Sequence, residues 1–423
     1  MKKTLFLTII ILIMSAILTA VFCGCTPQCI DPTDPETPSY SFSINKTSAK
    51  KLSIVCNDQS LDAIAQIIKD AIYENCGQTV PIVTDEQIKS VKKAIYIGDS
   101  AHINIDSVDN TLLPTTDHEF SFVVLDNAIW FKANSTIGYY NGASMFAHRL
   151  SESSAKGIGI LTQKHTGNDI LTAMSFNLMA GVQAGDERVD HVVDTVLKYK
   201  PDLIGVQEAT DVWMDILRQN LGEIYGIVGV GRNANCKDEH SAVLYLKEKF
   251  DLVTSGTKWL SQTPDIPGSK LPASHYTRIM TYALLSRKSD GKQLLHVNTH
   301  LDYGTTITEE QTKVAQVQTM FDIIDSLPKA PTIITGDFNA TVGAPAYDKM
   351  LENNYIDSAE HIPTRLRMPT YHGLRGTTGA PRHIDYIFTT ADFSSAYYRI
   401  CTEGVDGKDI SDHFPIFAVL NID

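Results

Sequence analysis

The sequence predicts a mixed α/β protein in which a two-layered β core is flanked by helices and preceded by a smaller α/β unit. Short β-branched runs typical of buried strands alternate with amphipathic stretches of helical period. Several of these runs end abruptly in a polar side chain. The composition, with 43% hydrophobic and 20% charged residues, is that of a globular protein. No repeat of solenoid period is visible.

The first 25 residues read as a targeting segment. Lys2 and Lys3 are followed by an almost wholly apolar run over residues 4–22, and the small Gly24 precedes Cys25. We favour a bacterial lipoprotein signal with the acylated cysteine at Cys25. Simple secretion and a retained membrane anchor are the alternatives. In every case the body of the protein lies outside the cytoplasm, so we expect a cell-surface lipoprotein or a secreted protein.

The next residues predict a tether and then a small α/β unit. Residues 26–44 are rich in Pro, Asp and Thr, which favours a stiff polar linker. Residues 45–165 alternate strand and helix patterns, and no catalytic constellation is visible in them. The expected strands cover residues 51–56, 94–97, 120–125 and 129–133, and the expected helices follow Ser60 and span about residues 137–150.

A second unit over residues 169–423 carries the two-layered β core. The expected strands cover residues 170–177, 203–207, 241–245, 282–286, 294–299, 332–335, 383–388 and 414–419. The helical patterns between them are strongest over residues 187–199 and 309–327.

Charge and cysteine content narrow the function classes. The net charge of −13 disfavours a broad, sequence-independent nucleic-acid binder, although a metal can neutralise the site of an acidic nuclease. The cysteines form no CxxC pair outside the N-terminal segment, which argues against a zinc site. Cys56 and Cys76 flank one expected helix and are either a disulfide or buried free thiols.

Polar side chains at strand ends are the main functional signal. The run ending in Gly336 delivers Asp337 and Asn339 two residues apart, as a strand-capping turn or as a pair that deprotonates and orients a water. Glu208 ends another apolar strand, and a carboxylate leaving a buried strand favours a cation such as Mg²⁺. Asn177 ends a third strand as a turn residue or a neutral ligand.

Histidines occupy the same expected edge. His300 ends one strand and is either a satisfied structural group or a functional imidazole. Adjacent Asp412 and His413 diverge in an extended chain, so they serve different neighbours. Asp385 is a natural orienting partner for His413. Glu239 reads by default as a solvated loop residue. Together these groups predict a site for metal-assisted hydrolysis of a phosphate ester.

The same motifs resemble the endonuclease/exonuclease/phosphatase superfamily in order and spacing. The resemblance covers about residues 169–423 and implies a four-layered α/β sandwich with the site at one edge. The loop over residues 257–268, followed by Arg278, resembles a loop in a bacterial, often exported, branch of the superfamily. The matching positions are Asn177, Gln207 and Glu208, Asn298 to Leu301, Gly336 to Asn339, Ile384 to Tyr386, and Ser411 to Pro415.

The resemblance also implies roles for individual residues. It implies Mg²⁺, with Mn²⁺ as the alternative, bound by Glu208 with Asn177 and Asp412 close by. It implies that Asp337 activates the attacking water and Asn339 orients it. It implies further that His413 paired with Asp385, and His300 paired with Glu239, bind the scissile phosphoryl group. Arg232 and Arg278 are candidates for phosphate binding, with surface salt bridges as the alternative.

These expectations favour a surface-anchored, Mg²⁺-dependent phosphoesterase. Its partners would be a small phosphorylated metabolite, a sugar phosphate or a phospholipid headgroup, with the membrane held through Cys25. A secreted nuclease is the alternative, and a non-catalytic binding protein with a relic site is a third hypothesis. The first α/β unit resembles the small domain ahead of the catalytic barrel in family 20 and family 67 carbohydrate-degrading enzymes.

Overall fold

A computed structural model describes most of the chain beyond the N-terminal segment. The described residues are 43–44, 47–88, 93–116, 119–125, 128–151, 159–160, 162–165, 170–182, 186–360, 367–376, 379–402 and 409–422. The expected signal segment and nearly all of the expected tether lie outside them. None of the helices in these ranges combines the length and the apolar character that a membrane span requires.

A six-stranded mixed sheet forms before residue 166. Its central strands pair in parallel, and β6 and β8 add antiparallel pairs at one side. In spatial order the strands are β4 (Ile82–Val83), β3 (Ser53–Cys56), β5 (Ala94–Ile97), β7 (Ala128–Ala133), β6 (Phe120–Leu125) and β8 (Gln163–His165). Its helices are α2 (Asp62–Cys76) and α3 (Thr136–Ser151), and the short elements are β1 (Ser43–Ile44), β2 (Thr47–Ser48), η1 (Ala49–Lys51), η2 (Gln59–Leu61), η3 (Asp85–Gln87), η4 (Ile105–Ser107) and η5 (Asn110–Leu112).

Two further six-stranded sheets form after residue 169. One runs β11 (Tyr225–Val228), β12 (His240–Leu246), β10 (Leu203–Ala209), β9 (Ile170–Asn177), β20 (Ile416–Ile422) and β19 (Phe393–Ile400). The other runs β13 (Phe250–Trp259), β14 (Ile279–Arg287), β15 (Gln293–His300), β16 (Thr332–Asp337), β18 (Asp385–Thr389) and β17 (Ile356–Asp357). The helices are α4 (Glu187–Tyr199), α5 (Asp211–Leu221), α6 (Ile307–Ser326), α7 (Pro345–Glu352) and α8 (Gly373–Gly376).

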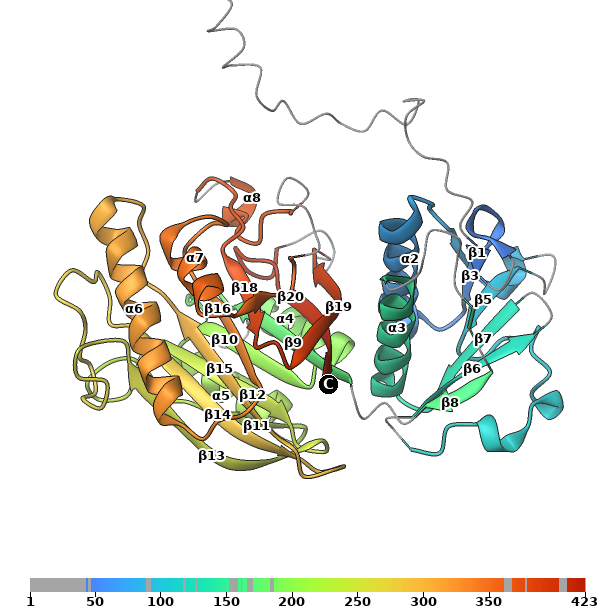
Figure 1. The fold of residues 1–423 in the computed structure, drawn as a ribbon, viewed down its shortest axis with the longest axis horizontal. Coiled ribbons are helices and arrows are strands. Elements are labelled where there is room, and N and C mark those ends of the chain that lie inside the picture. The colour runs from blue at the N-terminus through green and yellow to red at the C-terminus, as the bar shows by residue number, and fades with distance from the viewer. Residues whose placement is uncertain are drawn as a thin grey trace, which may run out of the picture. The chain divides into compact units, whose positions relative to one another are not determined.

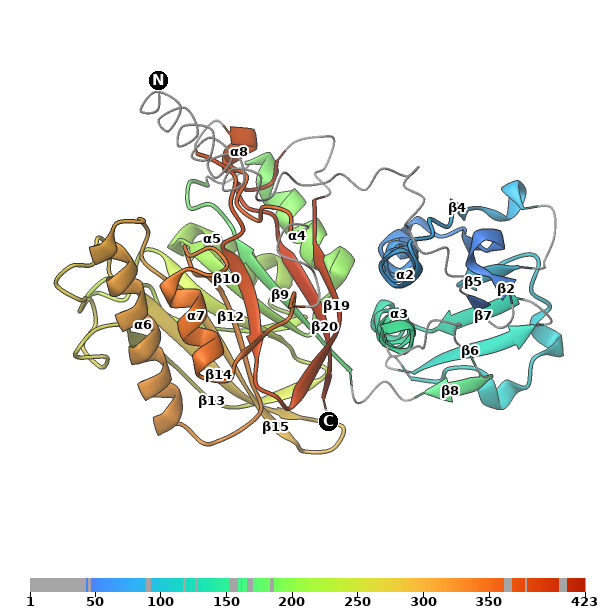
Figure 2. The ribbon, with the colours of Figure 1, turned by 45° about the horizontal axis from the view of Figure 1, so that its top comes forward.

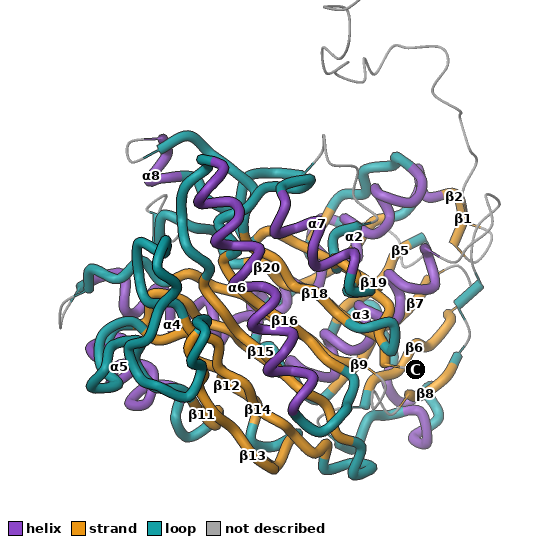
Figure 3. The backbone as a smooth tube through the Cα atoms, turned by 60° about the vertical axis from the view of Figure 1, so that its left-hand side comes forward, coloured by secondary structure: helices purple, strands orange, loops and turns teal. Residues whose placement is uncertain are grey.

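These two sheets pack face to face between helices (Figures 1 and 2). One apolar cluster joins their inner faces, with Ala173 and Val243 from one sheet and Ala283 and Ile333 from the other. A second cluster seats α6 and α7 on the outer face of the β15–β16 sheet, where Figure 3 shows α6 running across the strands. Helices α4 and α5 cover the other outer face through a third cluster. The layering confirms the predicted α/β fold with packed sheets flanked by helices.

The individual elements match the sequence expectation wherever the pattern was long. The expected strands and helices are all present, with ends displaced by a few residues. The strand expected over residues 383–388 begins at Asp385. Short or amphipathic edge elements, including β11, β13 and β19, were not anticipated. Cys56 and Cys76 are free thiols, and Cys76 Sγ donates to the Ile72 carbonyl at 2.9 Å, so of the two alternatives the free thiols hold, with Cys56 buried and Cys76 partly buried. The domain boundaries themselves stay a prediction.

Candidate active site

The predicted polar strand ends meet at one edge of the two packed sheets. Strands β9, β10, β15 and β16 end there, at Asn177, near Glu208, at His300 and at Asp337. Strands β12, β14, β18 and β20 run the other way and begin there. The pairing register places Asn177 opposite Gln207 and Asp337 opposite both His300 and Asp385. Strand direction and register thus bring the side chains together.

A buried polar layer joins the two sheets directly beneath this edge. Asn298 Nδ2 donates to the carbonyls of Val206 and Ala242 at 2.8 and 2.9 Å, and its Oδ1 accepts from Gln207 Nε2 at 2.7 Å. At Gly205 the sheets approach so closely that a Cβ atom would lie 2.4 Å from Asn298 Oδ1. Because buried polar groups are costly when unpaired, this layer fixes how the sheets align below the site.

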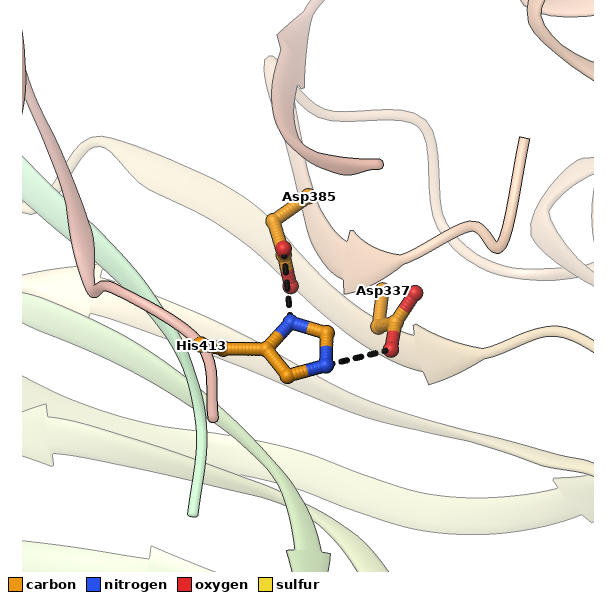
Figure 4. A group of neighbouring side chains, drawn as sticks. All are labelled: Asp337, Asp385 and His413. Carbon is orange, nitrogen blue, oxygen red and sulfur yellow. Dashed lines mark hydrogen bonds and ion pairs between the residues drawn. The ribbon is translucent and has the colours of Figure 1, made fainter. Parts of the chain in front are cut away.

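An imidazole lies between two carboxylates at the centre of the site. Figure 4 shows His413 with Nδ1 facing Asp385 and Nε2 facing Asp337. His413 Nδ1 and Asp385 Oδ2 are 2.9 Å apart, and Nε2 and Asp337 Oδ2 are 3.7 Å apart. All three side chains are buried. Asp385 therefore orients His413 as the sequence predicted.

The close packing of these groups shifts their protonation equilibria. Burial, followed by the negative charge of Asp385, raises the pKa of Asp337 to about 7. Burial alone would lower the pKa of His413, but the carboxylates of Asp385 and Asp337 outweigh it and raise that pKa to about 10. His413 is consequently an imidazolium near neutral pH.

This cluster offers one place for a metal ion. Ligand atoms of Asp337, Asp385 and His413 lie within 4.8 Å of one another. A metal there would have to displace the hydrogen bond between His413 and Asp385, because both ring nitrogens already face carboxylates.

The carboxylates that the sequence nominated as ligands offer a second place. Glu208 lies within a register shift between β10 and β12, and its left-handed φ of 55° turns its side chain out of the regular alternation. Burial raises the pKa of Asp412, and the charge of Glu208 raises it further. Among the ion pairs of the described ranges, none involves Glu208 or Asp412. Glu208 accepts hydrogen bonds from Asn177 Nδ2 and the Ala180 amide, and two interacting carboxylates without an ion-pair partner fit a hard divalent cation.

Asn177 connects this carboxylate pair to the His413 cluster. Its Nδ2 donates to Glu208 Oε1 and to Asp337 Oδ2, each at 3.1 Å. Its Oδ1 accepts from the Met179 amide at 3.0 Å, so the side-chain oxygen points away from Glu208. In this arrangement Asn177 bridges the two acids, and it would have to rotate its amide to offer an oxygen to a metal.

The Asp337–Asn339 turn caps its strand and places both side chains beside His300. The Asn339 amide donates to Asp337 Oδ1 at 2.9 Å, which is the strand-capping turn. Asn339 has a left-handed φ of 47°, and its Nδ2 donates to His300 Nε2 at 3.1 Å. The two side chains converge on the same imidazole, since His300 Nε2 and Asp337 Oδ2 are 3.4 Å apart.

His300 differs from the expectation in its partner and in its charge. Burial, with the nearby cations Arg278, His413 and Arg232, holds the pKa of His300 well below its usual value. Glu239 Oε2 accepts from Arg232 Nη1 at 2.7 Å, and within the described residues no hydrogen bond or ion pair joins Glu239 to His300. The expected His300–Glu239 pair is therefore wrong: the guanidinium outcompetes a neutral imidazole for the carboxylate.

Arg232 and Arg278 are built into the site rather than lying on the open surface. Both line a small pocket beside His300 and Glu208. Arg278 is 5% exposed and lies 3.6 Å from Asp302, and its Nε has no hydrogen-bond partner among the described residues. Arg232 is held by Asp238 as well as by Glu239. A buried guanidinium with unused donor capacity suits an anionic ligand.

Lys313 is a supporting residue that the sequence reading missed. It lies on the buried face of α6, and its Nζ donates to the carbonyls of Asn339 at 2.7 Å and Gly304 at 2.9 Å, and to Glu310 Oε1 at 2.8 Å. Its signal was a charged residue on the apolar stripe of an amphipathic helix, between Thr312 and Gln316. The ammonium group anchors the turn that carries Asn339.

Comparisons with known proteins agree with this geometry. The model of the Endonuclease/Exonuclease/phosphatase family matches residues 174–413, which is more than half of the chain. No curated protein matches.

Several solved structures are similar to this chain over about 60% of its length. A family protein from Bacteroides thetaiotaomicron is 27% identical, with a TM-score of 0.54 over 60% of this chain and 98% of that chain. One from Bacteroides vulgatus is 26% identical, with a TM-score of 0.54 over 60% and 99%. A mannosyl-6-phosphatase from Bacteroides thetaiotaomicron VPI-5482 is 27% identical, with a TM-score of 0.53 over 59% and 99%. From its family match, its layered fold and the motifs gathered at one sheet edge, the chain belongs to the endonuclease/exonuclease/phosphatase family.

Proposed function

We propose that the protein is a metal-dependent phosphoesterase that hydrolyses a small phosphorylated substrate by in-line attack of water. One observation carries the proposal: a base, a buried imidazolium, two carboxylates without an ion-pair partner and two guanidiniums lie around one edge of the packed sheets. Esters of phosphoric acid need this combination, because negative charge accumulates on the phosphoryl oxygens in the transition state. The likeness to a mannosyl-6-phosphatase supports a phosphorylated small molecule as the substrate class.

The protonation state of each residue suits it to a particular role in the reaction. Asp337, with its pKa raised to about 7, is suited to take a proton from the attacking water. The His413 imidazolium is suited to hold a phosphoryl oxygen, and Asp385 maintains its charge. Asn339 keeps His300 Nε2 as an acceptor by donating to it, so His300 positions groups without adding charge.

For the metal we propose the position at Glu208 and Asp412. Asn177 would complete it after rotation of its amide. Mg²⁺ there would neutralise charge on the phosphoryl group and on the leaving oxygen, with Mn²⁺ as a substitute. This position leaves the His413–Asp385 hydrogen bond intact.

The direct test is a substrate panel with the full-length chain. Phosphate release from monoesters and cleavage of simple diesters would be measured with Mg²⁺, with Mn²⁺ and with EDTA. We expect hydrolysis that EDTA abolishes and Mg²⁺ restores. Plasmid DNA and RNA digestion run alongside tests the nuclease alternative, and Asp337→Ala separates an enzyme from a binding protein with a relic site. Failure to cleave any ester, with or without metal, would overturn the proposal.

We also infer that the protein works outside the cytoplasm, held to a membrane through an acylated Cys25. The inference rests on the sequence of residues 1–25 alone. Metabolic labelling with a radioactive fatty acid in a bacterial host would test it. Label that Cys25→Ala abolishes is the expected result, and an unlabelled protein released into the medium would favour secretion instead. The role of the first α/β unit as an accessory domain remains a proposal on its resemblance.

A further inference from the structure

The pocket beside the His413 cluster is too small for a whole substrate. It is lined by Glu208, Arg232, Glu239, His240, Ser241, Thr277, Arg278, Ile279 and His300. Its cavity volume is about 10 Å³, which admits little more than one water molecule. A phosphoryl oxygen can enter between the arginines, so the organic part of the substrate must lie on the rim.

Two exposed tyrosines form that rim. Tyr276 and Tyr303 are 47% and 45% exposed, so both offer ring surface to a ligand. The guanidinium carbons of Arg232 and Arg278 lie 4.9 and 5.4 Å from the Tyr276 ring centroid, which places this tyrosine at the mouth of the pocket. Tyr303 follows His300 by three residues, and its ring centroid is 5.8 Å from that of Tyr276.

The rim is held in place by a network of its own. The buried Asp302 carboxylate accepts from the backbone amides of His275 at 2.6 Å and Tyr276 at 3.4 Å. The His275 ring stacks on Tyr303 with centroids 4.5 Å apart. His275 Nε2 is in turn 2.8 Å from Glu309 Oε1, at the start of α6. Exposed aromatic rings fixed in this way are preorganised for a ligand, because little side-chain entropy is lost on binding.

The relative orientation of the rings selects among ligand shapes. The Tyr276 and Tyr303 planes are inclined by 40°, and their centroids are 5.8 Å apart. A flat base inserted between parallel rings needs about 7 Å, twice the usual stacking separation, so the pair cannot sandwich one. A puckered pyranose ring, in contrast, can lay its C–H groups against the edge of this inclined pair and the face of Tyr303 that His275 does not cover, without entering between the rings.

We propose that Tyr276 and Tyr303 form a leaving-group subsite for the pyranose ring of a sugar phosphate, whose phosphoryl group faces Arg232 and Arg278. The assignment rests on the proposed phosphoesterase function and narrows its substrate class to phosphorylated monosaccharides. In the reaction, a water oxygen forms a bond to phosphorus while the bond between phosphorus and the sugar oxygen breaks. The sugar oxygen keeps the electron pair and takes a proton from water at the open rim, which releases a free sugar and inorganic phosphate.

The test compares substrates within each variant of the full-length chain. Phosphate release in Mg²⁺ is measured for mannose 6-phosphate, glucose 6-phosphate, glycerol 3-phosphate and 5′-AMP. For Tyr303→Ala we expect the ratio of kcat/KM for the sugar phosphates to that for glycerol phosphate to fall about tenfold, mainly through KM. Tyr303→Phe should keep the parent ratio, since the ring remains. Tyr73→Ala, at a tyrosine 56% exposed on α2, is the matched control and should also keep it.

The other possible outcomes each test one part of the proposal. An unchanged ratio in Tyr303→Ala would overturn the subsite, and a larger loss on 5′-AMP than on the sugar phosphates would assign the rim to a nucleobase. If the parent chain cleaves no ester, the proposed function fails, and the rim is then judged by binding alone. Quenching of tyrosine fluorescence by mannose 6-phosphate that Tyr303→Ala removes would still support the subsite, and its absence would overturn it.

Discussion

The candidate site holds two buried histidines in opposite electrostatic surroundings. His413 lies between Asp385 and Asp337, which raise its pKa to about 10 despite burial. His300 is equally enclosed, but Arg278, His413 and Arg232 are the charges around it, and its pKa is held well below the usual value. Both imidazoles lie within 4 Å of the same Asp337 oxygen.

Burial lowers the pKa of both imidazoles, and the charged neighbours decide whether that effect is reinforced, as at His300, or overcome, as at His413. The His413 side carries a fixed positive charge next to the base. On the His300 side, the positive charge is carried by two arginines, and the imidazole is a hydrogen-bond acceptor. A phosphoryl group bound between the two sides would meet cations from both, each held by its own carboxylates.

Replacing each histidine by glutamine should give the largest difference in activity between the two sides of the site. Gln is neutral, so it can take over the hydrogen bond of His300 with Asn339 but not the charge of His413. We expect kcat/KM for phosphoester hydrolysis to fall about a thousandfold in His413→Gln and about tenfold in His300→Gln. Thermal unfolding of both variants checks the fold. Because His413→Gln leaves Asp385 buried without a partner, the double variant His413→Gln/Asp385→Asn provides a folded control. Equal losses in the two single variants would refute the contrast.

Lys313 tests what holds the His300 side in place. Lys313→Met removes the donor to the Asn339 and Gly304 carbonyls and leaves Glu310 without its ion pair. We expect the free energy of unfolding to fall by about 3 kcal/mol, as when one partner of a buried pair is removed. Lys329→Met is the matched control, since that lysine pairs with Asp325 at the exposed surface, where such pairs contribute about 0.5 kcal/mol or less. Urea denaturation measures both, and a loss in Lys313→Met no larger than in the control would show that the anchor is dispensable.

The central residues of the site could be predicted from the sequence because the ends of buried strands are visible in it. A β-branched run that stops at a polar residue places that residue at a sheet edge, which located Asp337, Glu208 and His300. Long helical patterns such as that before Tyr199 were equally clear. In the fold, short edge strands such as β11 carry too few residues for a periodic signal.

Partner choice could not be predicted in the same way. Glu239 bonds to Arg232, seven residues away and in the same turn region, and this local pairing displaced the long-range pair with His300 that the family resemblance implied. Lys313 and Tyr276 act through contacts between segments distant in the chain, which no spacing rule encodes. Charge states depend on the same contacts, so the opposite behaviour of His300 and His413 could not be predicted from the sequence.

Substitutions at the proposed metal ligands test which part of the site binds the cation. If the cation lies at Glu208 and Asp412, Glu208→Gln should raise the Mg²⁺ concentration for half-maximal activity by about a hundredfold. Asp385→Asn should leave that concentration within about threefold, because Asp385 then serves only His413. Metal titrations of activity and calorimetric Mn²⁺ binding give independent readings. The reverse order of effects would move the metal to the Asp337–Asp385–His413 cluster.

The pH dependence of activity tests the contrast between His413 and His300, and its expected effects are the smallest. Asp337 must be ionised to accept a proton, so activity should rise with pH through its pKa of about 7, or lower when the metal is bound. His413 must stay protonated, so activity should be lost as pH rises through about 10. His300→Gln should move neither midpoint, because its imidazole is neutral across the range. Asp385→Asn should move both midpoints to lower pH, since it removes a negative charge that raises both pKa values. An alkaline midpoint that moves in His300→Gln would show that the titrating imidazole is His300 and not His413.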